Sequence, residues 1–227
     1  MKKQMPGVRC QVLGIVALVL GAFSLCGQVA KDANERYQTP EGRAAIGKGL
    51  SSPDRDARQK PRELVAAMAL KPGMVVADIG TGTGYMLPFL SEAVGSGGRV
   101  LGEDIFPDFL EKAKTNAKEH KLGNVEFVQG AEIDPSFPED GVDVALALDT
   151  YHHWNYPEKM LAALHRELRD GGRLVLVEFH KGAAGLPSNH IRLDEADVIK
   201  EIEANHFGLV SQHEHTKDQY MAIFEKK

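Results

Sequence analysis

The feature that most constrains the fold of this chain is an apolar run that ends in a glycine-rich turn. Residues 74–79 are almost continuously apolar, and Gly80, Gly82 and Gly84 alternate directly after them. Such a run is typical of a parallel strand buried on both faces. Glycines at its end let the backbone turn sharply and let a ligand approach where a Cβ would stand. The pattern predicts a strand, a tight turn with a ligand site, and a helix that begins near Tyr85.

Segments typical of strands and of helices alternate along the remaining chain. Helical patterns begin at Pro61, Pro107 and Pro157, and Gly171-Gly172 is expected to end the third of these helices. The expected strands cover residues 74–79, 99–103, 124–128, 142–148, 174–179, 208–213 and 220–224. A short polar connection between the last two predicts a hairpin. We therefore expect an α/β fold, Rossmann-like and doubly wound, with a mostly parallel seven-stranded sheet and an antiparallel C-terminal edge hairpin.

The chain of 227 residues is long enough for one well-buried domain, which we place at 61–227. Residues 31–60 are predicted to be a polar leader that packs on this domain or acts as a lid. Residues 1–30 combine a basic start with a short apolar core and small residues, which is typical of a secretory signal peptide. The alternative is an uncleaved N-terminal anchor. Both interpretations predict an exported domain, periplasmic or membrane-anchored, that faces away from the cytoplasm.

Cysteine usage and charge exclude several classes of function. Cys10 and Cys26 are the two cysteines of the chain, so a product cleaved after residue 26 has no thiol for a disulfide, a zinc–thiolate site or a nucleophile. The absence of a thiol in that product also argues against arsenic methylation through a thiol relay. The formal net charge is -5, and no run of the sequence concentrates lysine and arginine. We therefore expect a small-molecule substrate and no nucleic-acid partner, while the oligomeric state stays open.

Two acids flank the glycine turn and narrow the class of ligand. Asp104 lies at the expected end of the second strand, where a carboxylate can accept hydrogen bonds from ribose hydroxyls. The spacing Gly-x-Gly-x-Gly differs from the dinucleotide fingerprint Gly-x-Gly-x-x-Gly. Asp78, just before the glycines, would repel a pyrophosphate but suits a ligand with an ammonium and a sulfonium. The pattern favours S-adenosylmethionine, and an NAD-dependent oxidoreductase is the alternative.

Four segments carry a resemblance to a known family. Residues 75–85, 102–113, 124–132 and 170–180 resemble motifs of class I S-adenosylmethionine-dependent methyltransferases, near the ubiquinone/menaquinone-biosynthesis type and related small-molecule enzymes. The resemblance covers about residues 55–227. It departs from the family at Ala131, where an aspartate is common beside adenine, and at His206, where a glycine is common. The resemblance implies cofactor contacts from Asp78, Gly80, Gly82, Gly84, Tyr85, Asp104, Ile105 and Glu132, with Glu132 serving in place of the missing aspartate.

The segment after the fourth expected strand is predicted to face the methyl group. It contains Asp149 and the adjacent His152 and His153. Because methyl transfer is an in-line displacement, positioning supplies much of the rate, and a base is needed only if the acceptor loses a proton. We expect His152 or His153 to act as base or acceptor-orienting group, with Asp149 contacting the cofactor or the base. Alternatively, Tyr151 and Trp154 cover the core edge and one histidine caps a helix.

Three further hypotheses concern the rim of this site. Two histidines adjacent in sequence are not expected to point their rings the same way. A mixed divalent metal site from Asp149, His152, Glu178 and His180 is an alternative to our expectation of no bound metal. In the leader, Gln59 or Lys60 is a candidate contact for the methionyl carboxylate, with a solvated loop as the alternative. A protein that binds the cofactor without catalysis also remains open.

Overall fold

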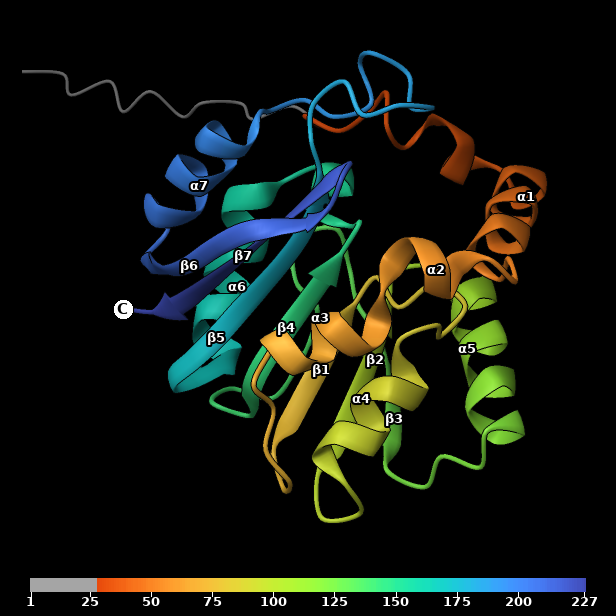
Figure 1. Ribbon diagram of the computed structural model, residues 1–227, viewed down its shortest axis with the longest axis vertical. Helices are drawn as coiled ribbons and strands as arrows, with labels where there is room; N and C mark the ends of the chain where they lie inside the picture. The colour runs from red at the N-terminus through yellow and green to blue at the C-terminus, as the bar shows by residue number, and fades with distance from the viewer. Residues whose placement is uncertain (1–27) are drawn as a thin grey trace, which may run out of the picture.

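The computed structural model describes residues 28–227, and its centre is one seven-stranded sheet (Figure 1). The strand order is β3-β2-β1-β4-β5-β7-β6. Neighbouring strands are parallel from β3 to β5, whereas β7 runs antiparallel to both β5 and β6. The strands are β1 (Val75–Ile79), β2 (Arg99–Asp104), β3 (Val125–Gln129), β4 (Val142–Leu148), β5 (Leu168–Phe179), β6 (Phe207–Thr216) and β7 (Gln219–Lys226). The predicted doubly wound sheet with its antiparallel edge hairpin is confirmed.

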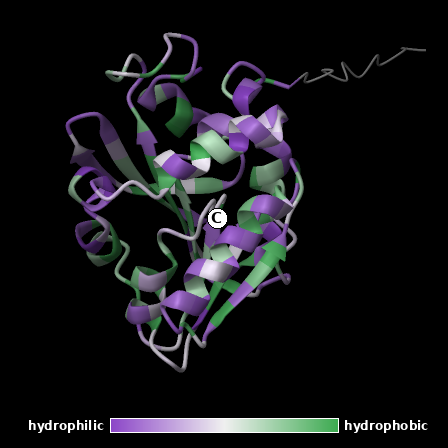
Figure 2. Ribbon diagram, turned by 90° about the vertical axis from the view of Figure 1, so that its right-hand side faces the viewer, coloured by the Kyte–Doolittle hydropathy of each residue, from purple (hydrophilic) through white to green (hydrophobic). Residues whose placement is uncertain are grey.

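Helices cover both faces of the sheet because successive strand side chains alternate between two cores. Ala77 and Ile79 of β1 belong to the core under α6 (Pro157–Glu167) and α7 (Glu195–Glu203). Val76 belongs to the opposite core, under α3 (Pro61–Ala67), α4 (Leu87–Val94) and α5 (Pro107–Glu119). The helices carry hydrophilic and hydrophobic residues together, as amphipathic helices on a sheet require (Figure 2).

The start of β5 differs from the prediction. Gly171-Gly172 was expected to end the helix that begins at Pro157, but this helix ends at Glu167 and the strand begins at Leu168. Leu168 pairs with Val142 and Arg173 pairs with Val144, so the residues between them bulge out of the ladder. Lys226 donates a hydrogen bond to the Leu168 carbonyl oxygen at 2.7 Å and stabilises this bulge.

The leader crosses the edge of the sheet where the parallel strands have their carboxyl ends (Figure 1). It contains a 3₁₀ helix η1 (Glu35–Gln38), α1 (Pro40–Leu50) and α2 (Arg55–Gln59). The loop after β5 contacts the leader: the Asn189 side-chain amide donates a hydrogen bond to Asp32 at 2.9 Å. Most of the predicted signal segment 1–30, with both cysteines, lies outside the described residues. Within residues 28–227, no helix is long and apolar enough to cross a bilayer.

Candidate cofactor site and acceptor pocket

The glycine turn after β1 is tied to the end of β2 by hydrogen bonds from its backbone N–H groups. The Gly80 N–H donates to Glu103 at 3.1 Å, and the Gly82 N–H donates to Oδ2 of Asp104 at 3.0 Å. The other oxygen of Asp104 accepts from the Phe106 N–H at 2.9 Å. Gly80 has a φ of 66°, and a Cβ there would lie 2.6 Å from the Thr150 side chain. This position therefore requires glycine, and the turn presents Asp104 at the carboxyl end of the sheet.

One cavity opens at this turn and runs along the carboxyl ends of the central strands. It encloses about 930 Å³ of empty space with its open mouth included, which suits an ordinary small-molecule site. The sheet supplies residues from the turn, from the ends of β2 and β4, and from the segment after β4, while the leader supplies the opposite wall. The leader residues that line it are Asn34, Tyr37, Gln38, Leu50 and Arg55.

The predicted cofactor residues divide into two groups. The cavity is lined by Gly80, Gly82, Asp104, Ile105 and Glu132, and Asn155, which also lines it, donates to Glu132 at 3.0 Å. The other three predicted residues lie outside its lining. Asp78 is buried and accepts from the Thr81 hydroxyl at 2.7 Å. A Cβ on Gly84 would lie 3.1 Å from the Ala113 Cα, so this glycine allows α5 to pack closely.

Tyr85, another predicted cofactor contact, packs against the leader. Its hydroxyl donates to Asp56 at 2.8 Å, and its ring lies under the Arg55 guanidinium, 4.0 Å from the ring centroid. Tyr85 therefore holds α2 in place and orients Arg55, which itself lines the cavity and is nine-tenths buried.

Buried carboxyl groups give this region an acidic character. Burial raises the pKa of Asp78 and of Asp104 to about 6 and that of Asp149 to about 7. Ionised carboxylates in a poorly solvated site are costly unless a cation approaches them. The arrangement therefore favours a positively charged ligand, as the sequence predicted, and disfavours a pyrophosphate.

Asp149 also lines this cavity and is held by two glutamine side chains. The Gln219 amide donates to one carboxylate oxygen at 2.6 Å, and the Gln59 amide donates to the other. Of the two leader candidates, Gln59 holds Asp149, while Lys60 is exposed and precedes α3 in the left-handed region with a φ of 43°. Arg55, one turn before Gln59, is the leader cation that lines the cavity.

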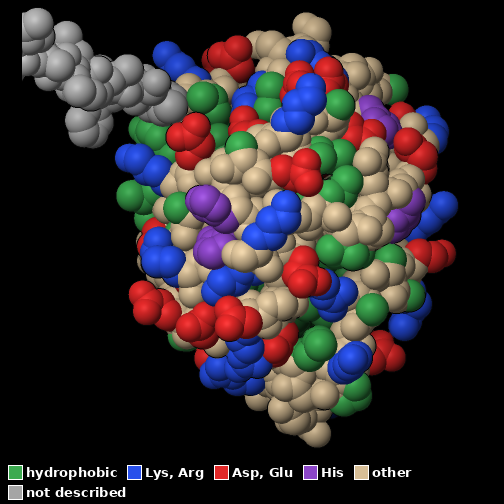
Figure 3. Space-filling view, turned by 90° about the vertical axis from the view of Figure 1, so that its left-hand side faces the viewer, with side chains coloured by type: hydrophobic (Ala, Val, Ile, Leu, Met, Phe, Trp, Pro, Cys, Tyr) green, Lys and Arg blue, Asp and Glu red, His purple; other side chains and the backbone are tan. Residues whose placement is uncertain are grey.

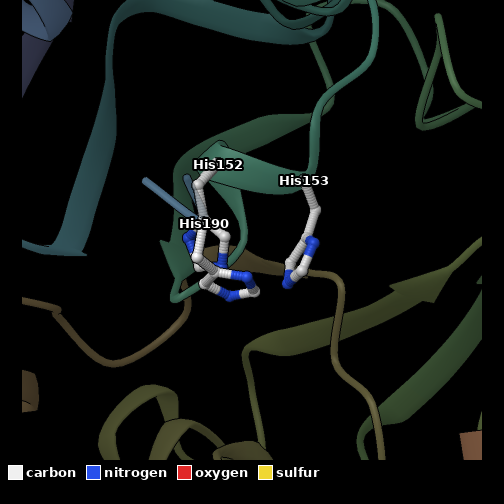
Figure 4. Close-up of side chains that lie close together, drawn as sticks. All are labelled: His152, His153 and His190. Carbon is white, nitrogen blue, oxygen red and sulfur yellow. The ribbon is translucent and has the colours of Figure 1, made fainter. Parts of the chain in front are cut away.

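His152 and His153 lie on a 3₁₀ helix, η2 (Tyr151–His153), directly after β4. Their ring centroids are 4.1 Å apart, so the expectation that the rings point in different directions is wrong (Figure 4). A 3₁₀ turn packs adjacent residues more tightly than an α-helix does. Of the two, His153 lines the cavity, whereas His152 is fully enclosed behind it.

Each of the two histidines has a defined partner. Nδ1 of His152 bonds to Glu178 at 2.8 Å, and Nδ1 of His153 bonds to the Asn34 side-chain oxygen at 2.9 Å. Burial lowers the pKa of His152 to about 3 and holds the pKa of His153 well below its ordinary value. Both rings are therefore neutral at physiological pH. They are better suited to orient an acceptor by a hydrogen bond than to take up its proton.

The metal set considered from sequence does not assemble. Glu178 bonds His152, but His180 lies elsewhere, with its Nε2 at 2.9 Å from Glu214 and its Nδ1 at 3.8 Å from Glu195. The described residues instead bring His190 beside His152 and His153 (Figure 4). His190 comes from the loop after β5, 37 positions beyond His153, and no motif marked it.

Sequence reasoning also missed the leader residues that line the cavity, Tyr37 and Arg55 among them. The ring of Tyr37 lies 5.9 Å from the Phe106 ring and 4.7 Å from the His153 ring, between the two ends of the cavity. Arg55 lies one helical turn before Gln59, one of the two leader residues proposed from the sequence. A helical projection of 54–60 would have placed Arg55 and Gln59 on one face.

Basic and acidic side chains are interspersed on the face drawn in Figure 3, with no broad area of lysine and arginine there.

Comparison with known proteins gives the family. A family model described as a methyltransferase domain matches residues 70–227. A ubiquinone/menaquinone biosynthesis C-methyltransferase from Marinomonas sp. is 33% identical over 128 residues, which are 56% of this chain and 51% of that protein. A demethylmenaquinone methyltransferase from Lactococcus lactis subsp. lactis is 36% identical over 108 residues, which are 47% of this chain and 42% of that protein. The chain thus spans about half the length of these curated relatives.

A solved structure agrees with this assignment. The chain superposes on a SAM-dependent methyltransferase from Aquifex aeolicus with a TM-score of 0.76 and 27% identity, covering 80% of this chain and 97% of that one. These matches favour a methyltransferase over the NAD-dependent oxidoreductase that the glycine turn also allowed. Since the family model covers more than half of the chain, and the sheet order agrees with it, this chain belongs to the class I methyltransferase family, with S-adenosylmethionine as its methyl donor.

Proposed function

We propose that this protein transfers the methyl group of S-adenosylmethionine to a small-molecule acceptor bound beside His153. The observation that carries the proposal is that one cavity connects Asp104, at the end of β2, with His153 and Trp154 after β4. A cofactor whose ribose contacts Asp104 can therefore direct its sulfonium toward a second compartment with different chemistry. The names of the relatives from quinone biosynthesis support a small organic acceptor.

The charges along the cavity give the cofactor a direction. Asp104 would accept hydrogen bonds from the ribose hydroxyls. Glu132 and Asn155 would contact the adenine amino group at the same end of the cavity. Arg55 is the cation available for the methionyl carboxylate, and Asp149 is the buried acid available for its ammonium. Opposite charges in a poorly solvated site attract strongly, so this orientation places the methyl group toward His153.

The transfer itself is an in-line displacement. An electron pair on the acceptor atom forms the new bond to the methyl carbon, and the bond from that carbon to sulfur breaks with its electron pair left on sulfur. The product of the donor is S-adenosylhomocysteine, and a proton on the acceptor leaves to water at the cavity mouth. Neutral His153 orients the acceptor by a hydrogen bond, which gives the near-attack geometry that accelerates such a step.

Calorimetric titration with S-adenosylmethionine, S-adenosylhomocysteine and NAD tests the donor half of this proposal. We expect both sulfur ligands to bind and NAD not to bind. Binding of NAD without binding of S-adenosylmethionine would refute the assignment of the donor. Turnover is tested by incubating radiolabelled donor with pooled quinones, phenols, amines and thiols. Tight donor binding with no labelled product from any pool would favour the non-catalytic alternative.

We also propose that residues 1–30 export the domain as a signal peptide, or tether it to the outside of the membrane as an anchor. The basic start and apolar core of this segment support the proposal. N-terminal sequencing of the native protein from periplasmic and membrane fractions tests it. A cleaved end near residue 27–30 would support a signal peptide, an intact end in the membrane fraction an anchor, and cytoplasmic protein would refute both.

A further inference from the structure

We propose that His152, His153 and His190 bind a divalent transition-metal ion of the zinc type at the acceptor end of the cavity. One ring nitrogen from each histidine lies within 4.8 Å of the other two, and Figure 4 shows the three side chains close together. The ring of His190 lies 4.8 Å from that of His152 and 5.6 Å from that of His153. Binding of the ion stands on these side chains alone, whereas its chemical role rests on the proposed function.

Hydrogen bonds to two of the rings determine which nitrogen is available. Nδ1 of His152 faces both oxygens of Glu178 at 2.8 Å, and Nδ1 of His153 faces the Asn34 side-chain oxygen at 2.9 Å. Nε2, the second nitrogen of each of these two rings, is therefore the one available to the ion. A histidine that ligates a metal usually donates its other ring N–H to a carboxylate or a carbonyl oxygen, which fixes the ring and increases its basicity. The pairs with Glu178 and Asn34 are contacts of this kind.

The ligand set indicates the class of ion. Imidazole nitrogens suit zinc, copper, nickel and iron, whereas calcium and magnesium prefer oxygen. In a tetrahedral zinc site with bonds of about 2.0–2.1 Å, ligand nitrogens lie about 3.3 Å apart. We expect His190, which is half-buried and stands on a loop, to rotate toward the ion and close the remaining gap. Three protein ligands leave a fourth position for an exchangeable ligand, as in catalytic zinc sites.

The open position would face the acceptor, because His153 lines the cofactor cavity. A hydroxyl or thiol group bound to the ion would release its proton to water more readily than the free group. The resulting anion would attack the methyl carbon, and the carbon–sulfur bond of the donor would break as before. In this arrangement His153 holds the ion, and the ion orients the acceptor.

The test is calorimetric titration of the full chain, purified without a histidine tag, with zinc sulfate. We expect one ion per chain, and tetrahedral visible absorption bands when cobalt(II) replaces zinc. His190→Ala should weaken zinc binding at least 30-fold, since one of three ligands is lost. The matched control is His180→Ala, from the separate and more exposed group of His180, Glu195 and Glu214, which should keep the affinity of the unmodified chain.

Three results would overturn the site: no stoichiometric zinc binding, unchanged affinity in His190→Ala, or an equal loss in His180→Ala. Titration of the same three proteins with S-adenosylhomocysteine separates this inference from the proposed function. Affinity for that ligand should be equal in all three. If it is absent in all three while zinc still binds, the donor assignment fails and the metal site stands.

Discussion

Replacing Asp104 with asparagine should weaken binding of S-adenosylmethionine by about 30- to 100-fold. The two oxygens of Asp104 accept from the N–H groups of Gly82 and Phe106, and each keeps a lone pair for a ribose hydroxyl. A hydrogen bond to a charged group contributes about 1.5–3 kcal/mol. Asparagine keeps one acceptor oxygen and turns an NH₂ group toward one of the two backbone donors. A loss of about 2–3 kcal/mol follows, and each 1.4 kcal/mol is about tenfold in affinity.

The same residue predicts how affinity depends on pH. Burial raises the pKa of Asp104 to about 6, so the carboxylate is ionised at pH 8 and protonated at pH 5. Protonation removes an acceptor and the negative charge, so affinity should fall as pH decreases through 6. Asp78 and Asp149 have raised pKa values and act in the same direction. The contribution of Asp104 is therefore the difference in pH dependence between the unmodified protein and the asparagine variant. The affinity of the variant should depend less on pH.

The assay is calorimetric titration with S-adenosylmethionine and S-adenosylhomocysteine at pH 8, 7, 6 and 5, with thermal unfolding as a check on folding. Asp143→Asn is the matched control, because Asp143 also accepts from a backbone N–H, that of Val75 at 2.7 Å, but lies at the opposite end of the sheet. It should bind within threefold of the unmodified protein. An affinity of the Asp104 variant within threefold of the original, in a folded protein, would refute the reasoning.

Three further predictions concern other parts of the site. Arg55→Gln should weaken S-adenosylmethionine binding at least tenfold but leave methylthioadenosine, which lacks the carboxylate, within twofold; equal losses by calorimetry would contradict the assigned contact. Once an acceptor is known, His153→Ala should lower kcat at least tenfold with S-adenosylhomocysteine affinity within threefold, and unchanged turnover would remove its role. Gly84→Ala should lower the thermal midpoint of unfolding, because its φ of 80° and the nearby Ala113 strain an added Cβ, whereas the open Gly97→Ala should not.

The sequence predicted the sheet well because its signals are local. Apolar runs between turns placed all seven strands, and prolines at helix starts placed α3, α5 and α6. The exception is Gly171-Gly172, whose turn signal belongs to a bulge inside β5. Nothing local announces that bulge, since it depends on contacts of Lys226 and on the register with β4.

The site was predictable only where one turn determines it. Gly80, Gly82 and Asp104 meet because parallel strands end at the same edge of the sheet. Tyr85 follows the glycines in sequence, yet the turn directs it to Arg55 and Asp56. His190 reaches the two adjacent histidines through a long loop, so only the tertiary structure brings these rings together.

This division explains why the donor is easier to assign than the acceptor. The donor half of the cavity is built on strand ends, which the fold fixes. The acceptor half is covered by the leader, where Asn34 bonds His153 through both its oxygen and its amide, and Tyr37 packs between Phe106 and the same histidine. Neither the leader nor the loop that carries His190 is part of the sheet. Substrate choice in this protein is therefore expected to lie in these two segments, because they can change without altering the scaffold that holds the cofactor.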